Sequence, residues 1–300
     1  ALLAGCSRSP GDSLSPQSGT SAASDEAEVS AAMAAAPELV EDGQYESADQ
    51  TRVDDGTGGL AAIRPLYFFR NIRSVECRFE IAFADTDSTG RPTTAIVTVH
   101  KHLRGTFNIV AGTRNETGVR DTSLIRVSKP LADHWARRLL LKRVPPLPED
   151  VASIGRLRPR WRTGATWGGQ VTSRAATTNI RAIHITTATM DTTIVDPLAF
   201  YRLRRVMKFE PGEAVRITVA TGRNDDVVVL VRAGLRSKFV NNGDNTYSLA
   251  WHAPERGGLH HVGVNALSNG TLFDDQLPYD SKAWIVPCVV SPTVLAEYMP

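Results

Sequence analysis

The stretch NNGDNTYSLAWHAP, residues 241–254, predicts a tight turn that leads into a β-strand. Asparagine, aspartate and glycine tolerate positive φ angles, so residues 241–245 are suited to closing a hairpin. In the segment that follows, Tyr247, Leu249 and Trp251 alternate with other residues and therefore share one face of a strand. Burial of such side chains stabilises a fold by about 1.5–3 kcal/mol each. We expect Trp251 to lie in a core rather than to form a platform for a ligand.

The same rhythm continues on both sides of this stretch. From residue 210 to residue 300, short apolar segments alternate with turn residues, at intervals of roughly 8 to 12 residues that are typical of a β-sandwich. This is the strongest indication of fold in the chain.

Loosely spaced residues in this range resemble the filamin-like and immunoglobulin-like modules of exported bacterial proteins. The residues that carry the resemblance are Pro211, Gly212, Gly243, Thr246, Tyr247, Trp251, Pro254, Gly257 and Gly258. The cysteine pair of antibody domains is missing, so the match is to the wider sandwich group. The resemblance implies an immunoglobulin-like β-sandwich domain over residues 210–300.

Residues 60–209 predict a second β-rich domain. The segments 78–84 and 94–100 read as two strands of a hairpin, joined by a turn of Asp, Ser, Gly and Pro residues. One segment between two prolines, residues 130–146, stays open between helix and strand. Leu131, Trp135 and Leu139 lie four residues apart, as on one side of a helix. We favour a helix near residues 131–144, although the neighbouring segments all predict strands.

The first residues resemble the end of a bacterial lipoprotein signal peptide. Leu3, Ala4, Gly5 and Cys6 match the Leu-small-small-Cys pattern of a lipobox. The resemblance implies that residues 1–5 are a signal-peptide remnant and that Cys6 carries the lipid anchor. Ser7 follows the cysteine rather than an aspartate, which implies an outer-membrane destination in the bacterial cell envelope. The acidic, Ser/Ala/Gly/Pro-rich residues 6–59 predict a disordered tether.

Charge is distributed unevenly along the chain, although the formal net charge is only +2. Residues 1–59 hold 2 basic and 11 acidic residues, whereas residues 60–210 hold 25 basic and 12 acidic residues. A basic block of this kind attracts anionic polymers or lipids. The alternative is that these cations are interleaved on wet faces and partly neutralised by the acidic N-terminal segment. A nucleic-acid partner is not expected for a lipoprotein outside the cytoplasm.

The chain has three cysteines and no C-x-x-C pair, which gives no support to zinc-ribbon or thioredoxin-like chemistry. If Cys6 is lipidated, Cys77 and Cys288 remain. They form either a disulfide in an oxidising compartment or, as we prefer, two buried thiols.

The best candidate for a ligand site is the stretch of residues 156–169, where arginines meet aromatic rings. Such side chains together suit a sugar ring or an anionic polymer. The candidate residues are Trp161, Trp167, Arg158, Arg160 and Arg162. The alternative is that the tryptophans fill the core while the arginines stay in water.

Evidence for metal binding is weak. Asp274, Asp275 and Asp280 lie close together in sequence and offer the oxygen ligands that calcium takes, but a loop held by Asx-type hydrogen bonds is the simpler explanation. His100 and His102 would share one face of a strand. No cofactor is expected.

The sequence therefore predicts a mainly β protein without a recognised catalytic motif, since G-x-S-x-G and the phosphate-binding glycine loops are missing. The leading hypothesis is a non-catalytic envelope lipoprotein that presents a binding module at a membrane surface to a glycan or protein partner. The first alternative is a carbohydrate or anionic-glycan binding protein. The second is a secreted hydrolase with its site between the two β domains. The oligomeric state stays open.

Overall fold

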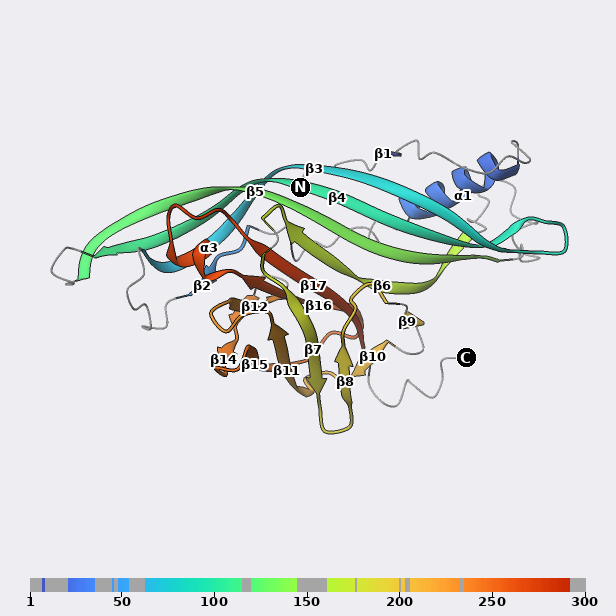
Figure 1. Cartoon of the computed structure of the whole chain (residues 1–300). Helices are drawn as coiled ribbons and strands as arrows, with labels where there is room; N and C mark the ends of the chain where they lie inside the picture. The colour runs from blue at the N-terminus through green and yellow to red at the C-terminus, as the bar shows by residue number, and fades with distance from the viewer. Residues whose placement is uncertain are drawn as a thin grey trace.

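The computed structural model describes residues 7–8, 21–35, 45, 48–53, 63–114, 120–144, 161–175, 177–199, 201–202, 206–232 and 235–291. Within these ranges the chain forms two β-sheets and two helices (Figure 1). The prediction of a mainly β fold is confirmed. In the described part of the chain, no helix is long and apolar enough to cross a membrane.

Three very long strands form one end of the larger sheet and arch across the top of Figure 1. They are β3 (Arg64–Thr86), β4 (Pro92–Arg114) and β5 (Arg120–Arg143). Strand β4 lies in the middle and pairs antiparallel with both neighbours along almost its whole length.

The predicted hairpin between β3 and β4 is confirmed. Ala84 pairs with Thr94 near its end. In the turn, the Asp87 carboxylate accepts hydrogen bonds from the backbone amides of Thr89 and Arg91. An aspartate side chain that binds the backbone two residues further along is a usual way to hold such a turn.

The two long strands bend where β3 carries a β-bulge between Ile72 and Ser74, opposite Gly105 of β4. A Cβ atom at Gly105 would collide with the backbone carbonyl oxygen of Asn71. A bulge adds one residue to one strand and bends the pair locally. Glycine at position 105 therefore permits the close backbone approach at the bend.

The larger sheet continues from β5 in the order β6, β17, β16, β12, β13. Their bounds are β6 (Trp161–Ser173), β17 (Ser281–Val290), β16 (Gly258–Leu267), β12 (Val227–Arg232) and β13 (Leu235–Lys238). Four short strands add to it: β1 (Ser7–Arg8), β2 (Thr51–Arg52), β9 (Tyr201–Arg202) and β10 (Met207–Phe209). Since β2 pairs with β3 and also contacts β13, the sheet curls round until its two ends meet.

The smaller sheet packs against part of the larger one. Its order is β14 (Val240–Asn241), β15 (Thr246–His252), β11 (Ala214–Thr221), β7 (Ile180–Thr186) and β8 (Asp191–Ile194). Between the sheets, Tyr247 and Trp251 are buried and Leu249 packs beside them, as predicted. Gly243 and Asn245 have positive φ angles of 87° and 65°, which confirms the predicted tight turn. The two layers form a sandwich.

The two sides of the larger sheet belong to two different cores. Along β12, Val229 and Val231 enter the first core, whereas Val228 and Leu230 enter the second. The first core fills the space enclosed by the curled sheet, and we call this side its inner face. The second core lies between the two sheets of the sandwich.

The predicted boundary at residue 209/210 is not a break in the sheets. Strands β7 and β8 lie before residue 210, yet β7 pairs with β11 of the smaller sheet. Strand β6 likewise pairs with β17. The spacing of apolar residues predicts that a segment is a strand, but it does not tell which distant strand is its neighbour.

The predicted helix near residues 131–144 is wrong, because residues 131–143 belong to β5. Leu131, Trp135 and Leu139 are buried and their neighbours face the other side. Residues four apart share a face of a strand as well as of a helix, so this spacing does not separate the two. Arg137 lies on the buried face too, with its guanidinium 5.1 Å from the centre of the Trp135 ring.

The predicted disordered tether over residues 6–59 is wrong for the described residues in that range. Helix α1 (Ser21–Ala35) buries Val29 and Met33 against the first core. Asp25 is fully buried and accepts a hydrogen bond from the Arg143 guanidinium at 2.9 Å. Arg91 forms a second ion pair with the same carboxylate at 3.5 Å. The acidic helix thus neutralises part of the basic block.

The predicted alternative of a disulfide between Cys77 and Cys288 is wrong. The two residues lie in different cores, and Cys288 is buried and outside any disulfide. Cys77, in contrast, is disulfide-bonded, so the expectation of two buried thiols is wrong for Cys77. The remaining predicted signal residues 1–5 and Cys6 lie outside the described residues.

Candidate functional site

The side of β3, β4 and β5 that faces away from the first core forms one continuous surface, which we call the outer face. Strand register places Glu76, His102 and His134 in one row across it. The next row contains Arg78 and His100. The smaller sheet covers this side of the larger sheet over β12, β16 and β17, whose residues enter the second core, and that core contains no residue of β3, β4 or β5.

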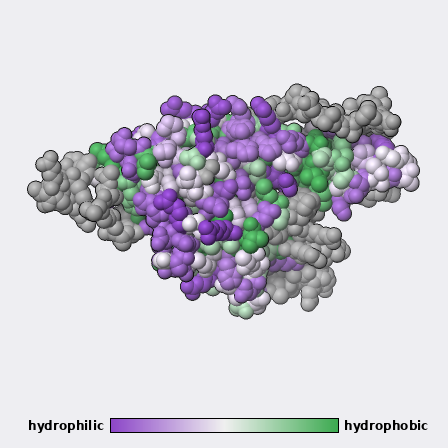
Figure 2. All heavy atoms as spheres, viewed as in Figure 1, coloured by the Kyte–Doolittle hydropathy of each residue, from purple (hydrophilic) through white to green (hydrophobic). Residues whose placement is uncertain are grey.

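Basic side chains dominate the outer face. Six of them are exposed and define what we call the basic face: Arg78, Arg104, Arg126, Arg138, Lys142 and Arg162. Arg162 of β6 pairs with Lys142 of β5, so the face continues onto the next strand. At about 3.3 Å per residue, the distance along β5 from Arg126 to Lys142 is about 50 Å. In Figure 2, hydrophilic side chains gather along the upper part of the molecule, where β3 and β4 run.

Three histidines meet near the middle of the outer face. The predicted common face of His100 and His102 is confirmed, and His134 of β5 joins them: its Nε2 lies 3.1 Å from His100 Nδ1. The ring centres of His102 and His134 are 4.9 Å apart. Partial burial lowers the pKa of His134, and His102, His100 and Lys282 lower it further. The His134 imidazole therefore stays neutral and available as a ligand over a wider pH range.

The inner face of the same strands carries a buried polar cluster. The Asp133 carboxylate accepts hydrogen bonds from Tyr45 at 2.9 Å and from Tyr279 at 3.1 Å. The Arg70 guanidinium lies 4.5 Å from the centre of the Tyr45 ring and donates to Asn265 at 2.6 Å. All five residues are almost fully buried.

This cluster joins segments that are distant in sequence. Burial raises the pKa of Asp133, while Arg70, Tyr45 and Tyr279 oppose the increase. Burial also raises the pKa of Tyr279 to about 12. Because these side chains are enclosed and come from β3, β5, β16 and residues 45 and 279, we expect the cluster to have a structural role.

The predicted ligand residues in 156–169 do not form one exposed group. Trp161 is 1% exposed and packs on the Phe83 ring, with ring centres 5.8 Å apart, so its indole is not a platform for a sugar. This agrees with the alternative that a tryptophan here fills the core. Arg158 and Arg160 lie outside the described residues, as does the side chain of Trp167. Arg162 is exposed and belongs to the basic face.

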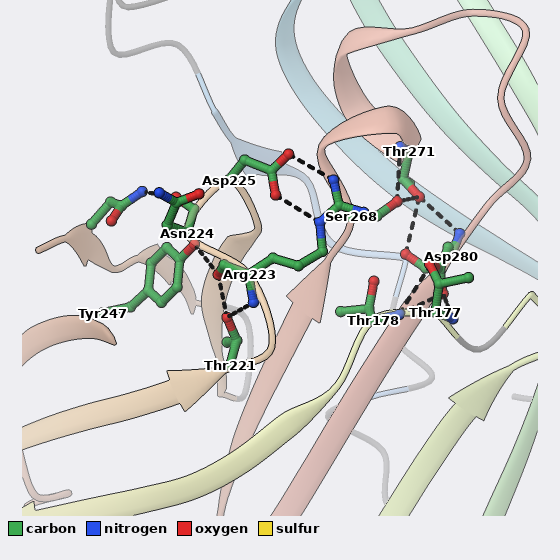
Figure 3. Close-up of polar contacts among 11 residues, drawn as sticks. Thr177, Thr178, Thr221, Arg223, Asn224, Asp225, Tyr247, Ser268, Thr271 and Asp280 are labelled. Atoms are coloured by element: carbon green, nitrogen blue, oxygen red, sulfur yellow. Dashed lines mark hydrogen bonds and ion pairs between the residues drawn. The ribbon is translucent and has the colours of Figure 1, made fainter. Parts of the chain in front are cut away.

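The predicted calcium candidates point to different partners. Asp280 is buried, and its carboxylate accepts hydrogen bonds from Thr177 and Thr178 (Figure 3). The same carboxylate accepts a hydrogen bond from the Ser173 hydroxyl. Asp274 instead accepts from the backbone amides that follow it, those of residues 276 and 277, beyond the short helix α3 (Asn269–Phe273). Asp275 is exposed. The simpler expectation, a loop held by Asx-type hydrogen bonds, is confirmed for Asp274.

A shallow groove of about 530 Å³ lies on the smaller sheet, lined in part by Arg216, Trp251 and His252. Trp251 is only 9% exposed, as expected for a core residue. The groove therefore offers little aromatic surface for stacking.

Comparison with protein-family models, with curated proteins and with solved structures gives no match for this chain. The functional argument therefore rests on the geometry of the outer face.

Sequence reasoning missed the contribution of His134 and the whole buried cluster. His134 lies 32 residues beyond His102, and it was placed in a predicted helix. Tyr45 falls in a segment that we expected to be disordered. Only strand register and the curling of the sheet bring these residues together.

Proposed function

We propose that this protein is a non-catalytic binding protein of the bacterial cell envelope that holds an anionic glycan on its basic face. The single observation that carries the proposal is the basic face itself, with its exposed arginine and lysine side chains on β3, β4, β5 and β6. Uronic or phosphorylated sugar polymers present repeated negative charges over similar lengths. Guanidinium groups bind carboxylates and phosphates through paired hydrogen bonds.

The geometry favours a charged polymer over a neutral sugar. A neutral glycan is held mainly by stacking on exposed aromatic rings, and the one candidate ring whose side chain is described, Trp161, is buried. Exposed charges are screened by salt over about 10 Å at 0.1 M ionic strength. We expect binding to be strongest at low salt and to weaken steadily as salt is added.

A direct test measures binding of the full chain to polygalacturonate, with dextran of similar size as a neutral control. The double variant Arg78→Glu/Arg138→Glu should reduce the affinity about tenfold or more, a change of about 1.4 kcal/mol. The matched control, Arg181→Glu/Arg216→Glu, reverses two exposed arginines on the smaller sheet. The proposal would be contradicted if both double variants lose the same affinity for polygalacturonate, or if the protein binds dextran as tightly as polygalacturonate.

A second arm separates a glycan from a lipid surface. Vesicles of neutral and anionic lipid are titrated with the same variants. Tighter binding to anionic vesicles than to polygalacturonate would replace the glycan with a membrane surface as the partner.

We further propose that the protein is anchored in the outer membrane through lipid on Cys6. The support is the resemblance of Leu3, Ala4, Gly5 and Cys6 to a lipobox. Mass spectrometry of the native protein decides this point. Lipid on the Cys6 sulfur excludes a disulfide between Cys6 and Cys77, and Cys77 is disulfide-bonded whereas Cys288 is not. A disulfide-linked or unmodified Cys6 would therefore overturn the anchor.

A further inference from the structure

The three histidines of the outer face bring metal-binding nitrogen atoms together from two strands. His100 Nδ1 and His134 Nε2 lie 3.1 Å apart, and the planes of the two rings differ by only 10°. His102 is the register partner of His134, and its ring plane lies within 30° of that of His134. All three side chains are at least partly exposed, so an ion can reach them from solvent.

The separation of the two nitrogen atoms suits a shared ion. With metal–nitrogen bonds of about 2.0 Å, a separation of 3.1 Å corresponds to an angle of about 100° at the metal. This value lies between those of square-planar and tetrahedral coordination. Imidazole is a preferred ligand of zinc, copper and nickel.

We propose that His100 and His134 bind one divalent transition-metal ion of the zinc, copper and nickel group, with His102 as the third ligand. Among the described residues, no three His, Cys, Asp or Glu side chains already lie in a metal-binding arrangement. The third bond therefore requires a rotation of the His102 ring, which its partial exposure permits. Water completes the coordination.

Glu80 supports this arrangement from the other side of the His100 ring. Its Oε2 lies 3.7 Å from His100 Nε2. When His100 binds the metal through Nδ1, its Nε2 carries the proton and faces this carboxylate. Metal-bound histidines usually donate their second N–H group to such a partner, which fixes the tautomer and the ring orientation.

The proton balance follows from the tautomers. In the metal-free protein, one of the two facing nitrogens carries a proton and donates it to the other. Both nitrogens present lone pairs to a bound ion, so this proton moves to the far nitrogen of its own ring. When the rings are neutral, no net proton is released on metal binding, whereas each protonated ring must lose one proton.

Neighbouring charges set a limit on affinity. Lys282 lies in the same row of the sheet as His134, with Thr172 of β6 between them. Arg78 is the register partner of His100. These cations oppose a divalent ion, whereas Glu76 and Glu80 of β3 favour it. This inference does not depend on the anionic-glycan proposal, because it rests on imidazole ligands alone.

The test is isothermal titration of the full chain with ZnCl₂ at pH 7.5, repeated with CuCl₂ and NiCl₂. We expect one saturable site, with a loss of affinity of about tenfold or more in His134→Ala and in His100→Ala. Glu80→Gln should weaken binding by about 10-fold to 100-fold, as for other outer-shell partners. At pH 5.5, protons should compete with the metal and weaken binding in the wild-type protein.

The matched control is His184→Ala. His184 is an exposed histidine of the smaller sheet, paired with Asp191 at 2.7 Å. Its loss should leave the affinity unchanged. The proposal would be overturned if no saturable binding is found. It would also be overturned if His134→Ala binds the metal as tightly as the wild-type protein does, or if His134→Ala and His184→Ala lose the same affinity. Circular dichroism of each variant checks that the fold is retained.

Discussion

The inner and outer faces of β3, β4 and β5 use the same kinds of residue in opposite ways. On the inner face, Arg70 and Arg137 are each 1% exposed. On the outer face, Arg78 and Arg138 are exposed. Arg137 and Arg138 are adjacent in sequence, and the two-residue repeat of a strand alone places them on opposite sides.

This difference shows why a count of charges does not locate a binding surface. The basic block of residues 60–210 includes cations that lie on aromatic rings in the core, such as Lys101 and Arg137 beside Trp135. Others pair with the buried Asp25 of α1. Only the basic side chains that are exposed to solvent can bind a partner.

The largest expected effect tests the buried cluster. Asp133→Ala removes the acceptor of Tyr45 and Tyr279 and leaves the Arg70 charge buried without its carboxylate. Breaking a buried charge network from one side costs about 3–5 kcal/mol. Urea unfolding should show this loss of folding free energy. If Asp133→Ala loses no more stability than a substitution at an exposed position, the structural role of the inner face is contradicted.

A smaller effect depends on pH. Burial lowers the pKa of His261 on β16 to about 3, and Arg137 and His260 lower it further. Because the unfolded state binds a proton near pH 6.5 and the folded state does not, stability should fall as the pH drops from about 6.5 toward 3. The expected loss between pH 7 and pH 5 is about 2 kcal/mol.

The measurement compares unfolding midpoints of the wild-type protein and His261→Gln at the two pH values. The variant should lose less stability on acidification, since glutamine does not titrate. His134→Gln on the outer face serves as the exposed counterpart and should change the acid sensitivity less. Parallel pH profiles for the wild-type protein and His261→Gln would contradict a neutral His261 imidazole in the folded state.

The smallest effect belongs to the outer face. Arg138→Ala should change the free energy of unfolding by less than about 0.5 kcal/mol, as is usual for exposed positions. Its contribution should appear instead in binding of polygalacturonate. If Arg138→Ala lowers the free energy of unfolding as much as Asp133→Ala does, the inner and outer faces do not differ in their contribution to stability.

Several local elements could be predicted from the sequence because their causes are local. The turn at residues 241–245 follows from residues that accept positive φ angles, and the burial of Tyr247 and Trp251 follows from their alternation. The hairpin of β3 and β4 follows from two β-rich segments and an aspartate turn. Helix and strand could not be separated for β5, because Leu131, Trp135 and Leu139 share a face in both.

The sequence by itself determined that the chain is mainly β and where its basic residues are concentrated, since both depend on composition and short-range alternation. Only the tertiary structure decided which of those basic residues are buried, that α1 packs on the core, and that His134 meets His100. Each of these depends on pairing between segments far apart in the chain. Strand register and the curling of a sheet bring such segments together, and neither can be predicted from the local sequence.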